Sequence, residues 1–311
     1  MAEVLRAGVI GAGVFGGYHA GKYAALPGVT LAGVYDHHAV HAEALAAKVG
    51  GRVFASEEEL IAAVDIVSIA TPAVAHAAAA IAALEAGKAV YVEKPLAADP
   101  ADAARIAELA AKRGVVAACG FLERAGLQAM GLFDVSERPT LLEAVRVSPP
   151  SPRNLDVSVV LDVMIHDLDL ALALGEGDPA MVEADGAALA NATLDRVDAE
   201  VEFETGFVAR FRASRIAEGG RRTLRVVYPS GEVRVDFVTH AFTNTTPFAL
   251  DPSFGETPAA KDKLGASLAA FIAAVRGERA APLASARDGA RALDLALAVE
   301  GALVQQGLVR G

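Results

Sequence analysis

Residues 9–16 read VIGAGVFG, and this stretch decides the fold of the N-terminal part of the chain. Gly11, Gly13 and Gly16 follow the apolar run 4–10, which is typical of a buried strand, and they open a helical pattern. The first glycine of such a turn allows a sharp bend, the second lets the backbone approach a pyrophosphate, and the third permits close packing of helix on strand. An ordinary tight turn is the alternative. We therefore predict a dinucleotide-binding turn whose cofactor contacts are Gly11, Gly13, Val14, Phe15 and Gly16.

An acidic residue, Asp36, ends the next strand pattern, twenty positions after Gly16. A carboxylate at this place accepts hydrogen bonds from ribose hydroxyls and repels a 2′-phosphate. We therefore expect NAD as the cofactor, with NADP as the alternative, because the neighbouring His37 and His38 would offset a 2′-phosphate only weakly. A simple strand-end cap is the other interpretation of Asp36.

Strand and helix patterns alternate with short connections through the first 120 residues. Such alternation is typical of a doubly wound parallel sheet, whose ligand loops lie at the carboxyl ends of the strands. We therefore predict a Rossmann domain over residues 1–120. Its predicted strands are 4–10, 29–35, 53–54, 66–70, 89–92 and 115–119.

The pattern changes after residue 121. Alternation with a period of two at 201–204, 208–212 and 233–237 predicts antiparallel strands with one covered face. The whole chain is thus predicted to be α/β, a Rossmann domain followed by an α+β domain over residues 121–311 that binds substrate and mediates oligomerisation. Its large, mostly antiparallel open sheet would leave one face exposed, so we expect a second copy to cover it in a homodimer or homotetramer.

Composition excludes several classes of function. The 311 residues carry a formal net charge of −11 without a basic block, which argues against nucleic acid as a partner. No apolar run is long and uninterrupted enough to span a membrane. The single cysteine, Cys119, cannot form an internal disulfide, so the sequence favours a reducing compartment and a cytoplasmic location.

Thr71 and Pro72 end the fourth strand pattern, and His76 follows four residues later. One interpretation is local: a threonine that caps a helix with proline in its first turn. The functional interpretation is a loop that lines the nicotinamide side of the cofactor site, to which Thr71, Pro72 and His76 would contribute.

The tripeptide Glu93-Lys94-Pro95 ends the fifth strand pattern. A lysine at the carboxyl end of a strand beside a cofactor can hydrogen-bond a substrate hydroxyl and stabilise the alkoxide that develops there. The peptide bond before Pro95 is a candidate for the cis form. A surface lysine before a turn is the alternative for Lys94.

Residues 162–170, DVMIHDLDL, place four ionisable groups in an apolar helical pattern. At about 100° per residue, Asp162, His166 and Asp169 fall within roughly 60° of each other on one stripe. Asp167 lies off this stripe, so we expect it to pair elsewhere or to meet solvent. Buried charge is costly unless it is paired or functional. The stripe is either a satisfied core histidine with its aspartates or the floor of an active site.

Together these motifs resemble those of the glucose–fructose oxidoreductase, inositol dehydrogenase and rhizopine-catabolism (Gfo/Idh/MocA) family. The resemblance implies an NAD(P)-dependent oxidoreductase that oxidises a sugar ring hydroxyl to a ketone by hydride transfer. It implies His166 as the general base, Lys94 as the group that polarises the same oxygen, and Asp162 as an orienting group. Glu93 and Lys94 would also contact the cofactor. The motifs that carry it are Gly11–Gly16, Ala70-Thr71-Pro72 with His76, Ala86-Gly87-Lys88, Glu93-Lys94-Pro95, Asp162-x-x-x-His166, Ala273–Gly277 and Asp288-Gly289.

A narrower resemblance concerns the substrate. The run 153–167 is similar to nucleotide-sugar members of the family that act on UDP-N-acetylglucosamine, so a nucleotide-linked amino sugar is the expected substrate. Members of this kind usually carry Arg-Phe-Asn-Pro after the linking strand, whereas this chain has Glu123-Arg124-Ala125-Gly126. Arg124 and Arg153 are candidates to bind a diphosphate, since a guanidinium can make two parallel hydrogen bonds to it.

Three alternatives remain at this point. A free sugar or an inositol is the alternative substrate. Some relatives use the fold as a non-catalytic, dinucleotide-dependent regulatory protein, which the presence of Lys94, Asp162 and His166 disfavours. A metal site on Asp162, His166 and Asp169 would have suitable ligand chemistry, but no further histidine or cysteine is clearly aimed at it, so we predict no metal.

Overall fold

The computed structural model describes residues 4–151 and 157–305. The chain forms two compact units. The first comprises Met1–Ala125 and Asp262–Ala290, and the second comprises Gly126–Lys261 and Arg291–Gly311. The predicted division lay at residue 120, so the first unit includes a segment, 262–290, that the sequence analysis had assigned to the second domain.

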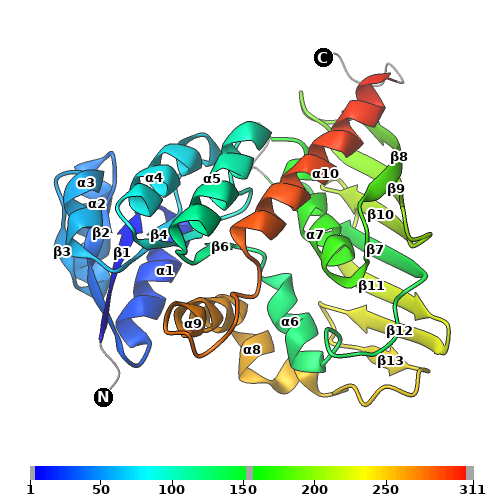
Figure 1. Ribbon diagram of the computed structural model, residues 1–311. Coiled ribbons are helices and arrows are strands. Elements are labelled where there is room, and N and C mark those ends of the chain that lie inside the picture. Colours follow the sequence, from blue (N-terminus) through cyan, green and yellow to red (C-terminus); the bar gives the residue numbers. More distant parts are fainter. Residues whose placement is uncertain (1–3, 152–156, 306–311) are drawn as a thin grey trace. The chain divides into compact units, whose positions relative to one another are not determined.

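The first unit contains a six-stranded sheet in the order β3-β2-β1-β4-β5-β6, and all its paired strands are parallel (Figure 1). This order confirms the predicted doubly wound Rossmann sheet. The strands are β1 (Leu5–Ile10), β2 (Val29–Tyr35), β3 (Arg52–Val53), β4 (Ile66–Ile69), β5 (Ala89–Val92) and β6 (Ala117–Cys119). The helices are α1 (Val14–Ala25), α2 (Ala39–Val49), α3 (Glu57–Ala63), α4 (Ala73–Glu85), α5 (Pro100–Arg113) and α9 (Lys263–Val275).

Local signals set the ends of these elements. Helix α5 begins where the Asp99 side chain accepts a hydrogen bond from the Ala101 N–H and Pro100 occupies the first turn. It ends at Gly114, which adopts a left-handed conformation with φ of 63°. The central strands β4 and β5 are buried along their whole length, as expected for a parallel sheet with both faces covered.

Helix α9 joins the first unit because its apolar face completes the core there. Leu268 and Phe271 are fully buried and belong to the same cluster as Tyr23 and Tyr91. The rings of Tyr91 and Phe271 meet edge to face, with centroids 5.7 Å apart. Sequence spacing does not identify this partner, because several apolar faces could have received the helix.

The second unit contains a seven-stranded sheet in the order β13-β12-β11-β7-β10-β9-β8. Only β7 and β10 pair in parallel, which confirms the prediction of a mostly antiparallel sheet. The strands are β7 (Leu141–Val147), β8 (Pro179–Ala187), β9 (Arg196–Phe203), β10 (Val208–Ser214), β11 (Arg221–Tyr228), β12 (Gly231–Asp236) and β13 (Phe242–Asn244). The helical segments are α6 (Glu123–Met130), η1 (Val160–Met164), α7 (Ile165–Leu174), η2 (Phe254–Glu256), α8 (Pro258–Lys261) and α10 (Ala286–Gln305), of which α6 and α10 each begin in the first unit.

One face of this sheet is covered and the other is open. On the covered face, α7 lies against β10, and the Arg146 guanidinium of β7 makes two hydrogen bonds to the Asp167 carboxylate of α7, at 3.0 and 2.7 Å. Both residues are buried. This bidentate pair fixes the helix on the sheet and explains why Asp167 lies off the predicted polar stripe.

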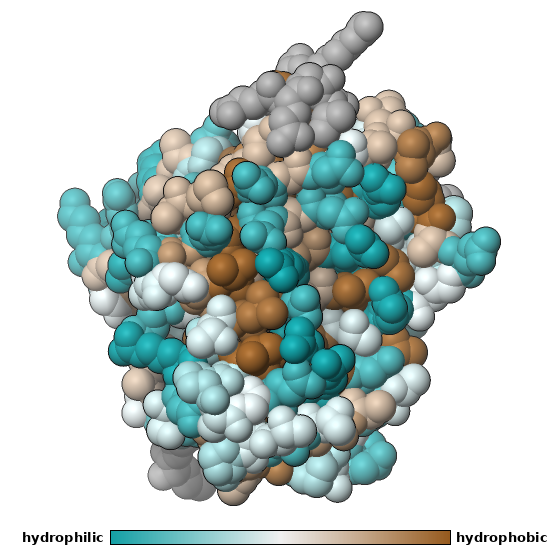
Figure 2. All heavy atoms as spheres, turned by 90° about the vertical axis from the view of Figure 1, so that its right-hand side faces the viewer, coloured by the Kyte–Doolittle hydropathy of each residue, from teal (hydrophilic) through white to brown (hydrophobic). Residues whose placement is uncertain are grey.

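The open face carries rows of cross-strand ion pairs instead of a continuous apolar surface. Figure 2 looks onto this sheet, where hydrophilic and hydrophobic side chains alternate. A hollow of about 1190 Å³ lies over it. The cross-strand ion pairs are Arg210–Glu200, Arg212–Asp198, Arg225–Glu143 and Arg225–Glu232, and Arg234 pairs with Glu232 within β12.

Within residues 4–151 and 157–305, no helix is both long and apolar enough to cross a membrane.

Candidate active site

The glycine-rich turn between β1 and α1 fits a dinucleotide. Gly11 has a φ of 96°, and a Cβ atom there would lie 2.7 Å from the Ala70 carbonyl group. At Gly16 a Cβ would lie 1.7 Å from the Gly11 oxygen. At Gly13, by contrast, no described atom lies within 4 Å of such a Cβ. The first and third glycines are thus required by the chain itself, whereas the second faces open space that a pyrophosphate can occupy.

The N-terminus of α1 faces the same space. Gly13 is its N-cap, no side chain caps it, and Val14 and Phe15 are 61% and 49% exposed. The first turn holds no acidic residue, so its unpaired N–H groups and the positive end of the helix dipole are available to an anion.

Asp36 at the end of β2 is bound to the same turn. Its carboxylate accepts hydrogen bonds from the Ala12 N–H at 2.7 Å and the His38 N–H at 2.8 Å, and His41 Nδ1 lies 3.5 Å away. Burial alone would raise the pKa of this carboxyl, but these partners hold the pKa below its usual range. Asp36 therefore braces the turn as an ionised group. A carboxylate has about four acceptor positions, so ribose hydroxyls can still bind to it.

Thr71 and Pro72 follow β4, and α4 begins after them with Pro72, not Thr71, as its N-cap. The Thr71 hydroxyl is buried, and in the described part of the chain it has no hydrogen-bond partner. A buried polar atom without a partner is costly, which is consistent with a ligand that would complete this site.

His76 on α4 is 1% exposed, and its ring nitrogens lie 2.8 Å from the carbonyl oxygens of Thr71 and Pro95. A carbonyl oxygen only accepts, so a neutral ring can satisfy one of these contacts and an imidazolium both. His76 thus bridges the two loops that carry the other candidates, and its ring is not accessible to solvent.

Glu93, Lys94 and Pro95 follow β5 directly. Glu93 is 8% exposed and lies 2.8 Å from the ring of His19, whereas Lys94 is partly exposed. The Lys94–Pro95 peptide bond is cis, which confirms the sequence expectation. Lys94 therefore lies at the carboxyl edge of the parallel sheet, where such sheets bind their ligands.

The polar helix of the second unit does not begin as a regular α-helix. Val160–Met164 form a π-helical turn, in which the Ile165 N–H donates to the Val160 carbonyl five residues earlier. The predicted uniform rotation of 100° per residue is therefore wrong for the turn that contains Asp162. Single π-turns inside helices are rare and occur frequently at functional sites.

Exposure separates the four ionisable groups of this helix. Asp162 and His166 are partly exposed, whereas Asp167 is 5% exposed and Asp169 is fully buried. Asp162 and His166 are thus the two that a ligand can reach. Asp169 is withdrawn from solvent.

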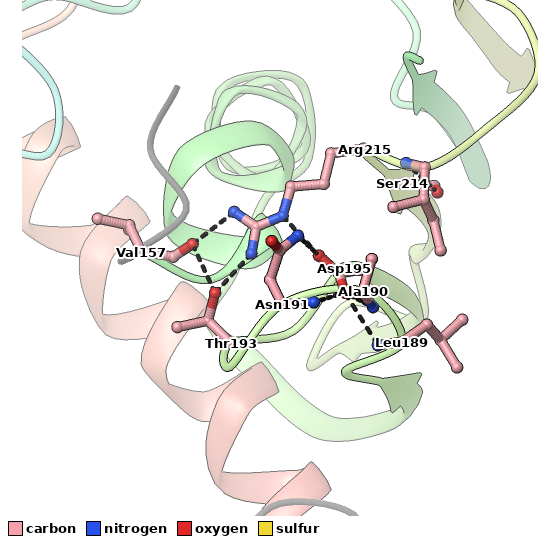
Figure 3. Close-up of polar contacts among 9 residues, drawn as sticks. Val157, Leu189, Ala190, Asn191, Thr193, Asp195, Ser214 and Arg215 are labelled. Atoms are coloured by element: carbon pink, nitrogen blue, oxygen red, sulfur yellow. Dashed lines mark hydrogen bonds and ion pairs between the residues drawn. The ribbon is translucent and has the colours of Figure 1, made fainter. Parts of the chain in front are cut away.

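A buried polar cluster holds the start of this helix (Figure 3). The Asp195 carboxylate accepts hydrogen bonds from three consecutive backbone N–H groups, of residues 189–191, and from Arg215 Nε at 2.9 Å. Arg215 also donates to the Val157 carbonyl at 2.7 Å and to the Thr193 hydroxyl at 2.5 Å. Burial alone would raise the pKa of Asp195, but these donors hold the pKa well below its usual range.

Two further contacts complete this start. The Ser158 hydroxyl accepts from the Leu161 N–H and donates to Glu300 of α10, and the Val159 N–H donates to the Leu194 carbonyl. The segment before Asp162 is thereby fixed on three sides.

The two candidate substrate arginines differ. Arg124 is 6% exposed, donates to the Leu283 carbonyl at 2.9 Å and lies 3.3 Å from Asp288. These contacts occupy its guanidinium within the first unit, so a diphosphate would have to compete with Asp288. Arg153 lies outside the described residues.

Two features of the candidate site were not predicted from the sequence, His19 and the Asp195–Arg215 ion pair. His19 follows Gly16 by one helical turn, and that spacing could have placed it on the face toward the strands. No local signal links Asp195 to Arg215, because they are 20 residues apart on different segments. Among the described residues, no group of three or more His, Cys, Asp or Glu side chains is placed to hold a metal ion.

Comparison with known proteins gives two family matches. The model for the oxidoreductase family with an NAD-binding Rossmann fold, GFO/IDH/MocA, matches residues 5–121. The model for the GFO/IDH/MocA C-terminal domain matches residues 146–234. The two matches cover the glycine-rich turn, the Glu93-Lys94-Pro95 tripeptide and the polar helix.

Individual relatives extend the likeness over nearly the whole chain. UDP-N-acetylglucosamine 3-dehydrogenase of Acidithiobacillus ferrooxidans is 35% identical over 312 residues, covering 95% of this chain and 97% of that protein. A solved structure of this enzyme has a TM-score of 0.87 at 34% identity and covers 97% and 98% of the two chains. An inositol 2-dehydrogenase of Cereibacter sphaeroides is 33% identical over 175 residues, covering 53% of this chain and 52% of that protein.

Three glycine-to-alanine substitutions test the turn. Gly13→Ala should fold like wild type but bind NAD at least about tenfold more weakly, because its methyl group occupies the open space. Gly16→Ala should lower both stability and NAD affinity, because its Cβ would collide with the Gly11 oxygen. Gly17→Ala is the control, since its Cβ would make an ordinary 3.7 Å contact with Leu45. Thermal unfolding and NAD titration measure the three. Wild-type NAD affinity in Gly13→Ala would contradict the proposed use of the turn.

Asp195→Asn tests the cluster in Figure 3. At neutral pH it should lower the free energy of unfolding by about 3 kcal/mol, because Arg215 remains buried without its counter-charge. The pKa of Asp195 is depressed in the folded state, so this contribution is present above the unfolded pKa of about 3.9 and is lost as the pH falls through the folded pKa. The difference from wild type should therefore shrink in acid, as measured by urea unfolding.

The exposed Lys261–Glu256 pair of the same unit provides the control for this experiment. Lys261→Gln should change the free energy of unfolding by less than about 1 kcal/mol. Equal losses from Asp195→Asn and Lys261→Gln would show that the buried cluster stabilises the unit no more than a surface ion pair does.

Proposed function

The chain belongs to the GFO/IDH/MocA family of oxidoreductases with an NAD-binding Rossmann fold, and from this membership we propose that it oxidises UDP-N-acetylglucosamine. The proposed reaction converts the hydroxyl at carbon 3 of the sugar ring to a ketone. The observation that carries it is the 35% identity to a UDP-N-acetylglucosamine 3-dehydrogenase, of which this chain covers 97%. Lys94, Asp162 and His166 are all present, which supports catalysis over a purely regulatory role.

The first unit would hold the cofactor. The turn at Gly11–Gly16 and the N-terminus of α1 would bind the pyrophosphate, and Asp36 would bind the adenosine ribose. Thr71, Pro72 and Glu93 would line the site further along the sheet edge, with His76 bridging the loops behind them. When bound, NAD supplies the acceptor for the hydride that leaves the sugar carbon.

Proton transfer falls to the chain's own residues. We assign His166 Nε2 or Nδ1 as the base that takes the proton of the reacting hydroxyl, because a neutral imidazole suits this task near pH 7. The Lys94 ammonium would donate a hydrogen bond to the same oxygen as negative charge develops. Asp162 would orient the substrate or Lys94. The buried cluster at Asp195 and the Arg146–Asp167 pair would keep the helix that carries His166 in place.

Arg124 and Arg153 are the proposed contacts for the diphosphate of the substrate. Arg153 would serve directly through its guanidinium. Arg124 would contribute only if the diphosphate displaces Asp288, so its effect on KM should be smaller.

Turnover of site variants on a panel of substrates tests the function. His166→Ala should lower kcat by roughly 10²–10⁴, and Lys94→Ala by roughly 10², while NAD still binds. Activity on UDP-N-acetylglucosamine should exceed that on myo-inositol and glucose, as followed by NADH absorbance.

The control is His240→Asn, which removes an exposed histidine of the same unit at a residue with φ of 60°, a conformation that asparagine tolerates. It should turn over like wild type. Full activity of His166→Ala would contradict its role as base. A preference for myo-inositol would contradict the proposed substrate but not the proposed class of reaction.

We further propose that the open face of the seven-stranded sheet is covered by a second copy of the chain. The hollow over this face is lined by both members of several ion pairs, so a second copy would meet charges of both signs. A cytoplasmic location remains a prediction from the single Cys119.

Sedimentation velocity at micromolar concentration tests the assembly. Wild type should sediment as a dimer or tetramer of the 31.9 kDa chain. Arg212→Glu should weaken association, because the new carboxylate lies beside Asp198 and meets like charge. A wild-type monomer under these conditions would refute the homo-oligomer.

A further inference from the structure

A chain of four buried polar side chains lies behind the Glu93-Lys94-Pro95 tripeptide. The Tyr23 hydroxyl lies 2.7 Å from Ser68 Oγ, Ser68 Oγ lies 2.9 Å from His19 Nδ1, and His19 Nε2 lies 2.8 Å from Glu93 Oε1. Tyr23, Ser68 and His19 are fully buried, and Glu93 is 8% exposed. This series of hydrogen bonds, called the relay below, connects α1 through β4 to the end of β5. The N-terminus of α1 forms the glycine-rich turn.

Hydrogen-bond accounting fixes the direction of this relay. Burial raises the pKa of the Tyr23 hydroxyl, so this group keeps its proton. Within the described residues, Ser68 is the only hydrogen-bond partner of that hydroxyl. Tyr23 must therefore donate to Ser68, because a buried hydroxyl proton without an acceptor costs free energy.

The rest of the relay follows from this first step. Ser68 accepts from Tyr23, so its own proton goes to His19 Nδ1, which must be unprotonated to accept it. His19 then carries its proton on Nε2 and donates it to Glu93 Oε1. An imidazolium would make Nδ1 a donor to Ser68, and one hydroxyl proton, of Ser68 or of Tyr23, would then have no acceptor among the described residues. Every hydrogen of the relay has an acceptor only with His19 in the Nε2–H form.

The Glu93 carboxylate is also confined on its other side. A Cβ atom at Gly120 would lie 2.9 Å from Glu93 Oε2 and 3.2 Å from Oε1, so a side chain there would have to displace the carboxylate. In the described part of the chain, no donor reaches Oε2. One oxygen is thus held by His19, and the other, Oε2, faces Gly120 without a donor among the described residues.

We propose that His19 is a positioning residue that holds the Glu93 carboxylate so that its second oxygen accepts a hydroxyl of the bound dinucleotide. This inference rests on the proposed function in one respect, the use of the β5 edge by NAD. The relay ties the helix that binds the pyrophosphate to the strand end that carries Lys94. The relay would thereby couple cofactor binding to the placement of the lysine segment.

NAD affinity of substrate-free protein tests the proposal, by titration with thermal unfolding measured in parallel. His19→Leu should bind NAD about tenfold more weakly, because Glu93 loses the donor that holds its Oε1. His19→Gln should stay within about threefold of wild type, because its amide can accept from Ser68 and donate to Glu93. Ser68→Ala is a smaller change, and its NAD affinity should fall between those of the two His19 variants. It replaces His19→Leu in the experiment if that variant does not fold.

Tyr91→Phe is the matched control. Tyr91 is fully buried on β5, and its ring contacts that of His19. Its hydroxyl shares a hydrogen bond of 2.8 Å with the Ser267 hydroxyl. The substitution removes one buried hydrogen bond and leaves the relay intact. It should lower the melting temperature but leave NAD affinity unchanged.

A double-mutant cycle and a spectrum distinguish positioning from a merely structural role. In a Glu93→Ala background, His19→Leu should weaken NAD binding by less than about twofold, since the group that it positions is gone. The ¹⁵N chemical shifts of His19 near neutral pH should report a protonated Nε2 and an unprotonated Nδ1. Additive losses in the cycle, unchanged NAD affinity in His19→Leu, or a protonated Nδ1 would each overturn the proposal.

These readouts are independent of turnover. If His166→Ala and Lys94→Ala kept full activity, the proposed function would fail while the His19 results stood. If His19→Leu bound NAD like wild type in an enzyme that His166→Ala inactivates, the positioning role alone would fail.

Discussion

Gly11 lies so close to the end of β4 that a Cβ atom would meet the Ala70 and Thr71 backbone within 2.9 Å, and the first unit depends on this contact. It requires the left-handed φ of 96° and excludes every side chain at this position. The same approach positions α1 over the sheet, and α1 in turn carries His19 to Glu93. A steric constraint at one residue thus determines where the pyrophosphate turn and the lysine-bearing strand end lie within the unit.

The second unit relies on buried charge in a comparable way. Arg146–Asp167 fixes α7 on the sheet, and Arg215–Asp195 fixes the segment that precedes η1. Burying ion pairs carries a large desolvation cost, so they stabilise a fold only when nearly every polar atom is satisfied. Both pairs approach this condition through bidentate geometry or several backbone donors. The two pairs thereby hold the helix in a defined position, in which Asp162 and His166 are partly exposed.

Local patterns explain why much of this could be predicted. The glycine turn, the alternating strands and the strand-end motifs depend on neighbours within a few residues, and the parallel and mixed sheets followed from them. The site residues were recognisable as motifs, but their environment was not. Arg146 and Asp167 are 21 residues apart. Helix α9 completes a core to which residues such as Tyr91, 170 or more positions earlier, belong. A π-turn shares its apolar pattern with an α-helix. Such features are decided by packing rather than by sequence spacing.

The division of the chain has a consequence for biosynthesis. The chain passes between its units after Ala125, after Lys261 and after Ala290, so neither unit is continuous in sequence. The Rossmann sheet would leave the ribosome long before Leu268 and Phe271, which complete its core. N-terminal domains commonly fold during translation, but the core of this one is complete only after α9 has been made. A chaperone that protects the nascent sheet would therefore have the most effect in the interval before α9 appears.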